Sequence, residues 1–125
     1  MCAPRMLVVD DDRACAEVVA QLLRDRGYTA DVAFDGAEAL RMVAQHPYSL
    51  VVLDYQLPGM NGVEVYRRAV ELRPELIGLL LTAFPRIDVV FPAIGVDMQR
   101  VLAKPVNEDE LIPLVDQLMA QSHSG

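Results

Sequence analysis

The chain has 125 residues, of which 53% are hydrophobic, and its formal net charge is −7. This length fits one domain with a substantial core and is too short for two. No apolar run approaches the roughly 18 residues of a membrane-spanning helix, and the N-terminus lacks a signal-peptide pattern. The negative charge argues against direct binding to nucleic acid or to an anionic membrane. We therefore expect one cytoplasmic domain over residues 1–125, with a frayed tail from about residue 121.

Short apolar runs alternate with amphipathic stretches along the whole chain. The sequence predicts five strands, at Met6–Val9, Thr29–Ala33, Leu50–Leu53, Leu76–Leu81 and Arg100–Ala103, of which the second has the weaker pattern. Apolar spacings of three and four predict helices over Arg13–Arg26, from Asp35 to about His46, over Gly62–Leu72 and from about Asn107 onward. An alternation of strand and helix predicts an α/β fold, with one parallel sheet covered by helices on both faces.

Two predicted helices contain proline. The spacing of Ile87, Val90 and Phe91 indicates a fourth helix within Ala83–Gln99, but Pro92 interrupts it. In the last helix, Pro113 falls in the second turn and removes one backbone donor. We expect Pro113 to bend this helix or to delay its start.

Polar residues follow every predicted strand except the second. Strand one leads into Asp10–Asp12, strand three into Asp54, strand four into Thr82 and strand five into Lys104. The carboxyl ends of parallel strands meet at one edge of the sheet, and ligands of open α/β sheets bind there. We therefore expect these side chains to converge, although they are far apart in the sequence.

The converging residue types are suited to phosphoryl transfer. Several carboxylates at one point repel one another, and Mg²⁺, which carboxylates and phosphate oxygens bind, relieves this repulsion. Lys104 supplies a positive charge for a phosphate, and Thr82 supplies a hydroxyl donor. A carboxylate could then attack phosphorus in line while the cations neutralise the charge on the other oxygens.

Four motifs in this order resemble the receiver domain of two-component response regulators, the family that includes the chemotaxis regulator. They are Val8–Asp11, Leu53–Asp54 with Pro58–Gly62, Leu81–Ala83, and Lys104–Pro105. The resemblance covers nearly the whole chain. It implies a flavodoxin-like three-layer sandwich with five helices and a five-stranded parallel sheet of order 2-1-3-4-5.

The resemblance also implies a metal site that holds Mg²⁺, with Mn²⁺ as an alternative. Asp11 would bind the cation directly and Asp10 would bind it through water. Asp54 and the backbone carbonyl of Gln56 would complete the protein's contribution.

Asp54 would be the phosphoacceptor, taking its phosphoryl group from a histidine kinase or a histidine phosphotransfer protein. Thr82 and Ala83 would then bind the phosphoryl group, and Lys104 would pair with it. The domain would catalyse only its own phosphorylation and dephosphorylation, and would signal to a downstream protein that the sequence does not identify.

The output face departs from the family pattern. Many receivers carry an aromatic residue three positions before the lysine, which moves when the threonine does; here that switch position, paired with Thr82, is Val101. Valine has no equivalent aromatic rotamer exchange. Two hypotheses follow: the chain switches through a displaced or disordered fourth helix, or it passes the phosphate on without switching.

Two other functions are compatible with part of the pattern. One is a degenerate receiver that docks onto a partner regardless of phosphorylation. The other is a haloacid-dehalogenase-like phosphatase, with Asp10–Asp12 read as Asp-x-Asp, followed by Thr82 and Lys104. Such phosphatases usually need a cap domain and a further acidic pair, which this sequence does not offer.

Overall fold

Five parallel strands form the central sheet, from which the functional edge is built. The computed structural model describes residues 4–82, 98–104 and 106–123. The strands are β1 (Arg5–Val9), β2 (Thr29–Ala33), β3 (Leu50–Asp54), β6 (Ile77–Thr82) and β7 (Met98–Ala103). They pair in the order β2-β1-β3-β6-β7, which is the order that the family resemblance implies.

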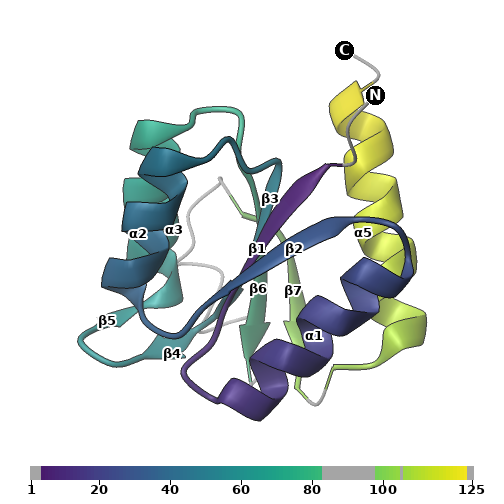
Figure 1. The fold of residues 1–125 in the computed structure, drawn as a ribbon, viewed down its shortest axis with the longest axis horizontal. Coiled ribbons are helices and arrows are strands. Elements are labelled where there is room, and N and C mark those ends of the chain that lie inside the picture. Colours follow the sequence, from purple (N-terminus) through teal and green to yellow (C-terminus); the bar gives the residue numbers. More distant parts are fainter. Residues whose placement is uncertain (1–3, 83–97, 105, 124–125) are drawn as a thin grey trace.

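Helices cover both faces of this sheet. The described residues contain four of them: α1 (Arg13–Asp25), α2 (Gly36–Gln45), α3 (Gly62–Leu72) and α5 (Glu108–His123). Helices α2 and α3 lie on one face and α1 and α5 on the other (Figure 1). The fourth predicted helix, with Pro92, falls within residues 83–97, outside the described residues. None of the described helices is long and apolar enough to cross a membrane.

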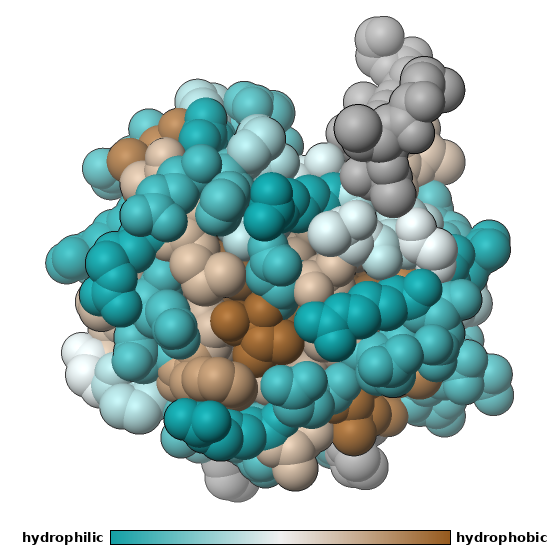
Figure 2. Space-filling view, viewed as in Figure 1, coloured by the Kyte–Doolittle hydropathy of each residue, from teal (hydrophilic) through white to brown (hydrophobic). Residues whose placement is uncertain are grey.

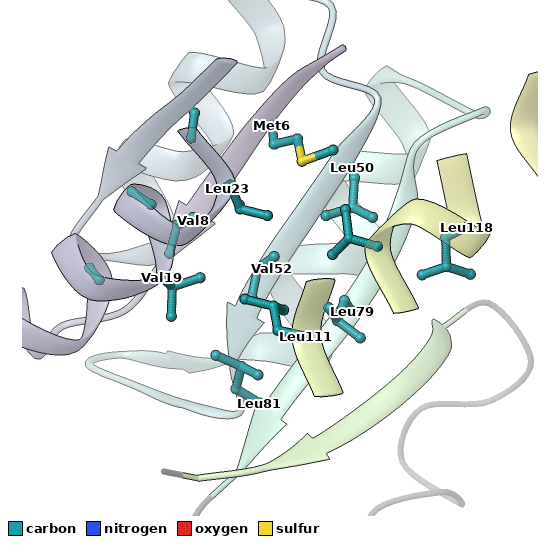
Figure 3. Close-up of a cluster of buried hydrophobic side chains, with 14 of the residues drawn as sticks. Met6, Val8, Val19, Leu23, Leu50, Val52, Leu79, Leu81, Leu111 and Leu118 are labelled. Carbon is teal, nitrogen blue, oxygen red and sulfur yellow. The ribbon is translucent and has the colours of Figure 1, made fainter. Parts of the chain in front are cut away.

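The central strands divide their side chains between two hydrophobic cores. Leu50 and Val52 of β3 face the core under α1 and α5, whereas Val51 and Leu53 face the core under α2 and α3. Figure 3 shows the first core, in which side chains of β1, β3 and β6 meet those of α1 and α5. Both faces of β3 are buried, which explains its uninterrupted apolar sequence.

The structure differs from the sequence-based prediction in two places. The predicted loop after Asp54 contains a small antiparallel hairpin of β4 (Gln56–Leu57) and β5 (Met60–Asn61). Helix α5 is not delayed by Pro113, because it begins at Glu108 and continues through the proline to His123. The Asn107 side chain accepts from the Asp109 N–H at 2.8 Å and fixes this start.

Three tyrosine hydroxyls connect elements that are distant in the sequence. Tyr28, in the turn between α1 and β2, donates to Asp116 of α5, whose other oxygen accepts from Arg26 at 3.0 Å. Tyr48 donates to Asp31 of β2 at 2.6 Å. Tyr66 of α3 donates to the carbonyl of Leu76 at 2.9 Å. The first of these contacts joins α5 to the α1–β2 turn.

Strand β2 lies at an edge of the sheet, and side chains cover part of its free edge. Arg24 donates from Nε and Nη2 to the carbonyl of Ala30, at 3.1 and 2.8 Å. The N–H of Phe34 donates to Glu38 Oε1 at 2.8 Å. Figure 2 shows an apolar area over β2 between α1 and α2. An uncovered edge strand is prone to pair with another chain, so these contacts protect the strand.

Replacing Arg24 by methionine should lower the free energy of unfolding by about 1–2 kcal/mol, because the buried Ala30 carbonyl loses both donors. Urea denaturation followed by circular dichroism measures the change. Arg41→Met removes an exposed arginine from α2 and is the matched control, with an expected change within about 0.5 kcal/mol. Equal losses in the two variants would contradict the assigned role of Arg24.

Candidate functional site

Residues from four strand ends meet at the carboxyl edge of the sheet. Lys104, which follows β7, places its Nζ 2.8 Å from Asp10 Oδ2 and 3.2 Å from Asp54 Oδ2. The Lys104 N–H also donates to the Thr82 carbonyl at 2.8 Å, so β6 and β7 end side by side. Asp10, Asp54 and Thr82 are all buried. Of the residues whose convergence the strand pattern predicts, the structure therefore brings Asp10, Asp54 and Lys104 into contact and places the end of β6 at Thr82 beside them.

Asp11 adds a third carboxylate to this group. Asp10, Asp11 and Asp54 each offer an oxygen, and these oxygens lie within 4.8 Å of one another. Asp11 is exposed, whereas the other two carboxylates are buried. Three carboxylate oxygens at this spacing suit a hard divalent cation such as Mg²⁺, which prefers oxygen ligands and keeps several of its waters. The residues present therefore fit the metal that the family resemblance implies.

The segment after Asp54 folds back closely against its backbone. Gly62, the first residue of α3, donates its N–H to the Tyr55 carbonyl at 2.7 Å. A Cβ at position 62 would lie only 2.4 Å from the carbonyl oxygen of Asp54, so this approach requires glycine. Gly59 has a φ of +81°, which lets the hairpin turn tightly. The Gln56 N–H thereby comes within 3.4 Å of Asp54 Oδ1.

The two buried aspartates differ in how easily they ionise. Burial disfavours the charge on Asp10, but the hydrogen bonds from Lys104 and from the Asp12 N–H outweigh it and lower the pKa of Asp10. Burial also disfavours the charge on Asp54, and the nearby Asp10 anion adds to this effect. Lys104 offsets only part of it, so the pKa of Asp54 is raised. Ionising Asp54 therefore costs more free energy than ionising Asp10, and Asp54 is the more basic of the two carboxylates.

Two neighbouring features are absent from the sequence-based prediction. Burial and the adjacent Asp10 carboxylate raise the pKa of the Cys15 thiol to about 11, so it stays neutral beside the site. Cys15 also lines an open groove of about 510 Å³ with Lys104 and the exposed Val18 of α1. The apolar spacing of Ala14 and Val18 directly after the aspartates is the only signal of this groove in the sequence.

Three other residues named in the sequence analysis are Asp12, Ala83 and Val101. Asp12 caps α1 by accepting from the Cys15 N–H at 3.3 Å, which agrees with an acid at a helix N-terminus. Ala83 lies outside the described residues. Val101 belongs to β7, but the structure describes only its backbone. Its role as a switch position stays a prediction.

Comparison with known proteins identifies the family. The sequence profile of the response regulator receiver domain matches residues 6–116. The chain is 34% identical over 118 residues to the transcriptional regulatory protein DltR of Streptococcus agalactiae, covering 94% of this chain and 53% of that protein. It is 35% identical over 118 residues to the response regulator MprA of Mycobacterium ulcerans, covering 94% and 51%. The chain thus spans about half the length of these curated relatives.

Solved structures agree with the sequence comparison. A CheY-like response regulator receiver domain protein from Methanospirillum hungatei superposes with a TM-score of 0.89 at 27% identity, covering 98% of this chain and 99% of the other. The response regulator TrrA from Thermotoga maritima, solved with Mg²⁺ and beryllium fluoride, gives a TM-score of 0.80 at 34% identity, covering 92% and 98%. The family expected from the sequence is confirmed: the chain belongs to the response regulator receiver domains of two-component systems.

Proposed function

We propose that the chain accepts a phosphoryl group on Asp54, with Mg²⁺ bound by Asp10, Asp11, Asp54 and the Gln56 carbonyl. The observation that carries this proposal is the position of the Asp54 carboxylate. It lies 3.2 Å from the Lys104 ammonium group and within 4.8 Å of two other carboxylates. Because Asp10, Asp11, Asp54 and Lys104 are all present and lie together, we prefer phosphorylation to the degenerate docking module. The match to the receiver family over residues 6–116 also favours this proposal over the phosphatase alternative.

Asp54 is a better nucleophile than Asp10 for two reasons. Asp10 is 1% exposed and accepts hydrogen bonds from both Lys104 and the Asp12 N–H. Asp54 is 7% exposed and its pKa is raised. A more basic carboxylate that an approaching donor can reach is suited to attack, whereas the fixed anion of Asp10 is suited to hold a cation.

The transfer forms one bond and breaks another. An oxygen of Asp54 attacks the phosphorus of a phosphohistidine, the phosphorus–nitrogen bond breaks, and the imidazole leaves with that bond's electron pair. The product is an acyl phosphate. Lys104 and the Thr82 hydroxyl would bind phosphoryl oxygens, and a bound divalent cation would neutralise further negative charge. Water that attacks the phosphorus of this acyl phosphate would break its bond to the Asp54 oxygen, release inorganic phosphate and regenerate the Asp54 carboxylate.

The donor is, we propose, a histidine kinase or a histidine phosphotransfer protein of the same cell compartment, the cytoplasm. The relatives carry regulatory names and are about twice as long as this chain, so the response belongs to a partner or to a further segment. Whether the output face switches or only relays the phosphate depends on residues around Val101. Beyond its own phosphorylation and dephosphorylation, we assign the domain no enzymatic activity.

Covalent labelling by acetyl phosphate tests the phosphoacceptor. Wild-type protein should be labelled only with Mg²⁺ present, and Asp54→Asn should abolish labelling because the nucleophile is lost. Lys104→Gln should slow labelling roughly a hundredfold, the typical cost of losing one group that stabilises transition-state charge. Intact-mass measurement follows the reaction. Asp25→Asn, at an exposed site in α1, is the control that should label normally; full labelling of Asp54→Asn would refute the assignment.

Mg²⁺ should stabilise the wild-type protein in thermal unfolding. A ligand that binds only the native state adds about 1.4 kcal/mol for each tenfold rise above its Kd. Asp11→Asn should remove most of this gain, because it deletes the exposed ligand without disturbing the buried pair. Scanning calorimetry across a Mg²⁺ series measures the effect. The same gain in both proteins would place the cation elsewhere.

In metal-free buffer, Asp54→Asn should be more stable than wild type at pH 7. The pKa of Asp54 is higher in the folded than in the unfolded state. The native state therefore binds more protons, and wild-type stability falls as the pH rises from the unfolded to the folded pKa of Asp54. The asparagine variant has no carboxyl group at position 54 and does not lose stability in this way. Its higher free energy of unfolding should therefore disappear when the pH is below both the folded and the unfolded pKa of Asp54. Urea titrations at several pH values measure it; a variant less stable than wild type at pH 7 would contradict the prediction.

A further inference from the structure

The first residue of α2 makes close contact with the hairpin that follows Asp54. A Cβ at Gly36 would lie 2.8 Å from Val65 Cγ2, 3.0 Å from Met60 Cγ and 3.1 Å from Met60 Sδ. Gly36 does not have a positive φ, so its backbone conformation does not explain the glycine. The contacts do, because any side chain at this position would displace Val65 or Met60. We call this contact surface, formed by Gly36 and Val65, the Gly36 notch.

The notch is held firmly on the α2 side. The Asp35 side chain accepts from the Glu38 N–H at 2.7 Å and caps the helix. Glu38 in turn accepts from the Phe34 N–H at 2.8 Å, which fixes the turn before α2. Val65, on the α3 side, is 1% exposed within the core under α2 and α3. The side chain free to adjust at this contact is therefore Met60, which is only partly buried.

Met60 connects the notch to the phosphorylation site through the hairpin. Met60 pairs with Leu57, and Gln56 pairs with Asn61 in the same two-residue ladder. Asn61 also caps α3 by accepting from the Glu64 N–H at 2.9 Å. The Gln56 N–H lies 3.4 Å from Asp54 Oδ1, so the position of the hairpin affects the orientation of the Asp54 carboxylate.

We infer that Gly36 and Met60 are positioning residues: the Gly36 notch holds Met60 and thereby fixes the Gln56 backbone beside the cation and Asp54. This inference rests on the proposed cation site. It assigns to the start of α2 an effect on cation affinity, although α2 contributes no side chain to the site. Groups that orient metal ligands typically change affinity ten- to a hundredfold when they are lost.

Calorimetric titration with Mg²⁺ tests the inference in a double-mutant cycle. Gly36→Ala should weaken Mg²⁺ binding roughly tenfold by displacing Met60, and Met60→Ala should weaken it by removing the anchor. In the Met60→Ala background, Gly36→Ala should weaken binding much less, because the side chain that transmits the displacement to the hairpin is gone. In a Val65→Ala background, Gly36→Ala should still weaken binding. If Gly36→Ala fails to fold, Met60→Ala alone carries the test.

Val115→Ala is the control for lost stability alone, since it removes core volume under α1 and α5, and its Mg²⁺ affinity should match wild type. The inference is overturned if Gly36→Ala weakens binding equally with and without Met60, or if neither Gly36→Ala nor Met60→Ala weakens it. Failure of the proposed function looks different: wild-type protein would then bind no Mg²⁺, or Asp11→Asn would bind it as well as wild type.

Discussion

The contact of one ammonium group with two buried carboxylates is the interaction on which the functional edge depends. Lys104 reaches both Asp10 and Asp54, and its own side chain is only 20% exposed. Oxygens of the Asp10 and Asp54 carboxylates lie within 4.8 Å of each other. Two buried carboxylates this close repel each other unless a cation lies between them. Burial alone would lower the pKa of Lys104. The hydrogen bond to Asp10 and the charges of Asp10 and Asp54 outweigh burial and raise this pKa, so Lys104 stays charged. Lys104 therefore keeps the metal-free site assembled.

Both layers of the sandwich contribute to this edge. From the α1 and α5 side come Asp12, which caps α1 and donates to Asp10, and Lys104, which precedes α5. From the α2 and α3 side come Gly62, which approaches the Asp54 backbone, and the hairpin that contacts Gly36. Each layer has its own hydrophobic core, so the site is positioned by two packing arrangements that share only the sheet.

The strands and the converging residues could be predicted because their signals are local. The apolar run Leu50–Leu53 indicates burial on both faces, and the polar residue that ends each strand marks the functional edge. The hairpin β4–β5 could not be predicted, because strands of two residues have no detectable period. The contact between Gly36 and Val65 joins residues far apart in the sequence, and neither residue indicates it. The predicted delay of the last helix by Pro113 does not occur, because the loss of one backbone hydrogen bond is outweighed by the Asn107 cap and by the burial of Leu111 and Val115.

The tyrosine contacts also determine how the protein can be observed by optical spectroscopy. The sequence has no tryptophan and four tyrosines, so tyrosine dominates its near-ultraviolet emission. Tyr28 and Tyr48 donate to carboxylates, which quench phenol emission by accepting the excited-state proton. Tyr66 donates to a carbonyl. Tyr55 immediately follows Asp54 and packs, partly buried, against the core under α2 and α3. The native protein thus carries a fluorophore on the residue next to its phosphoacceptor.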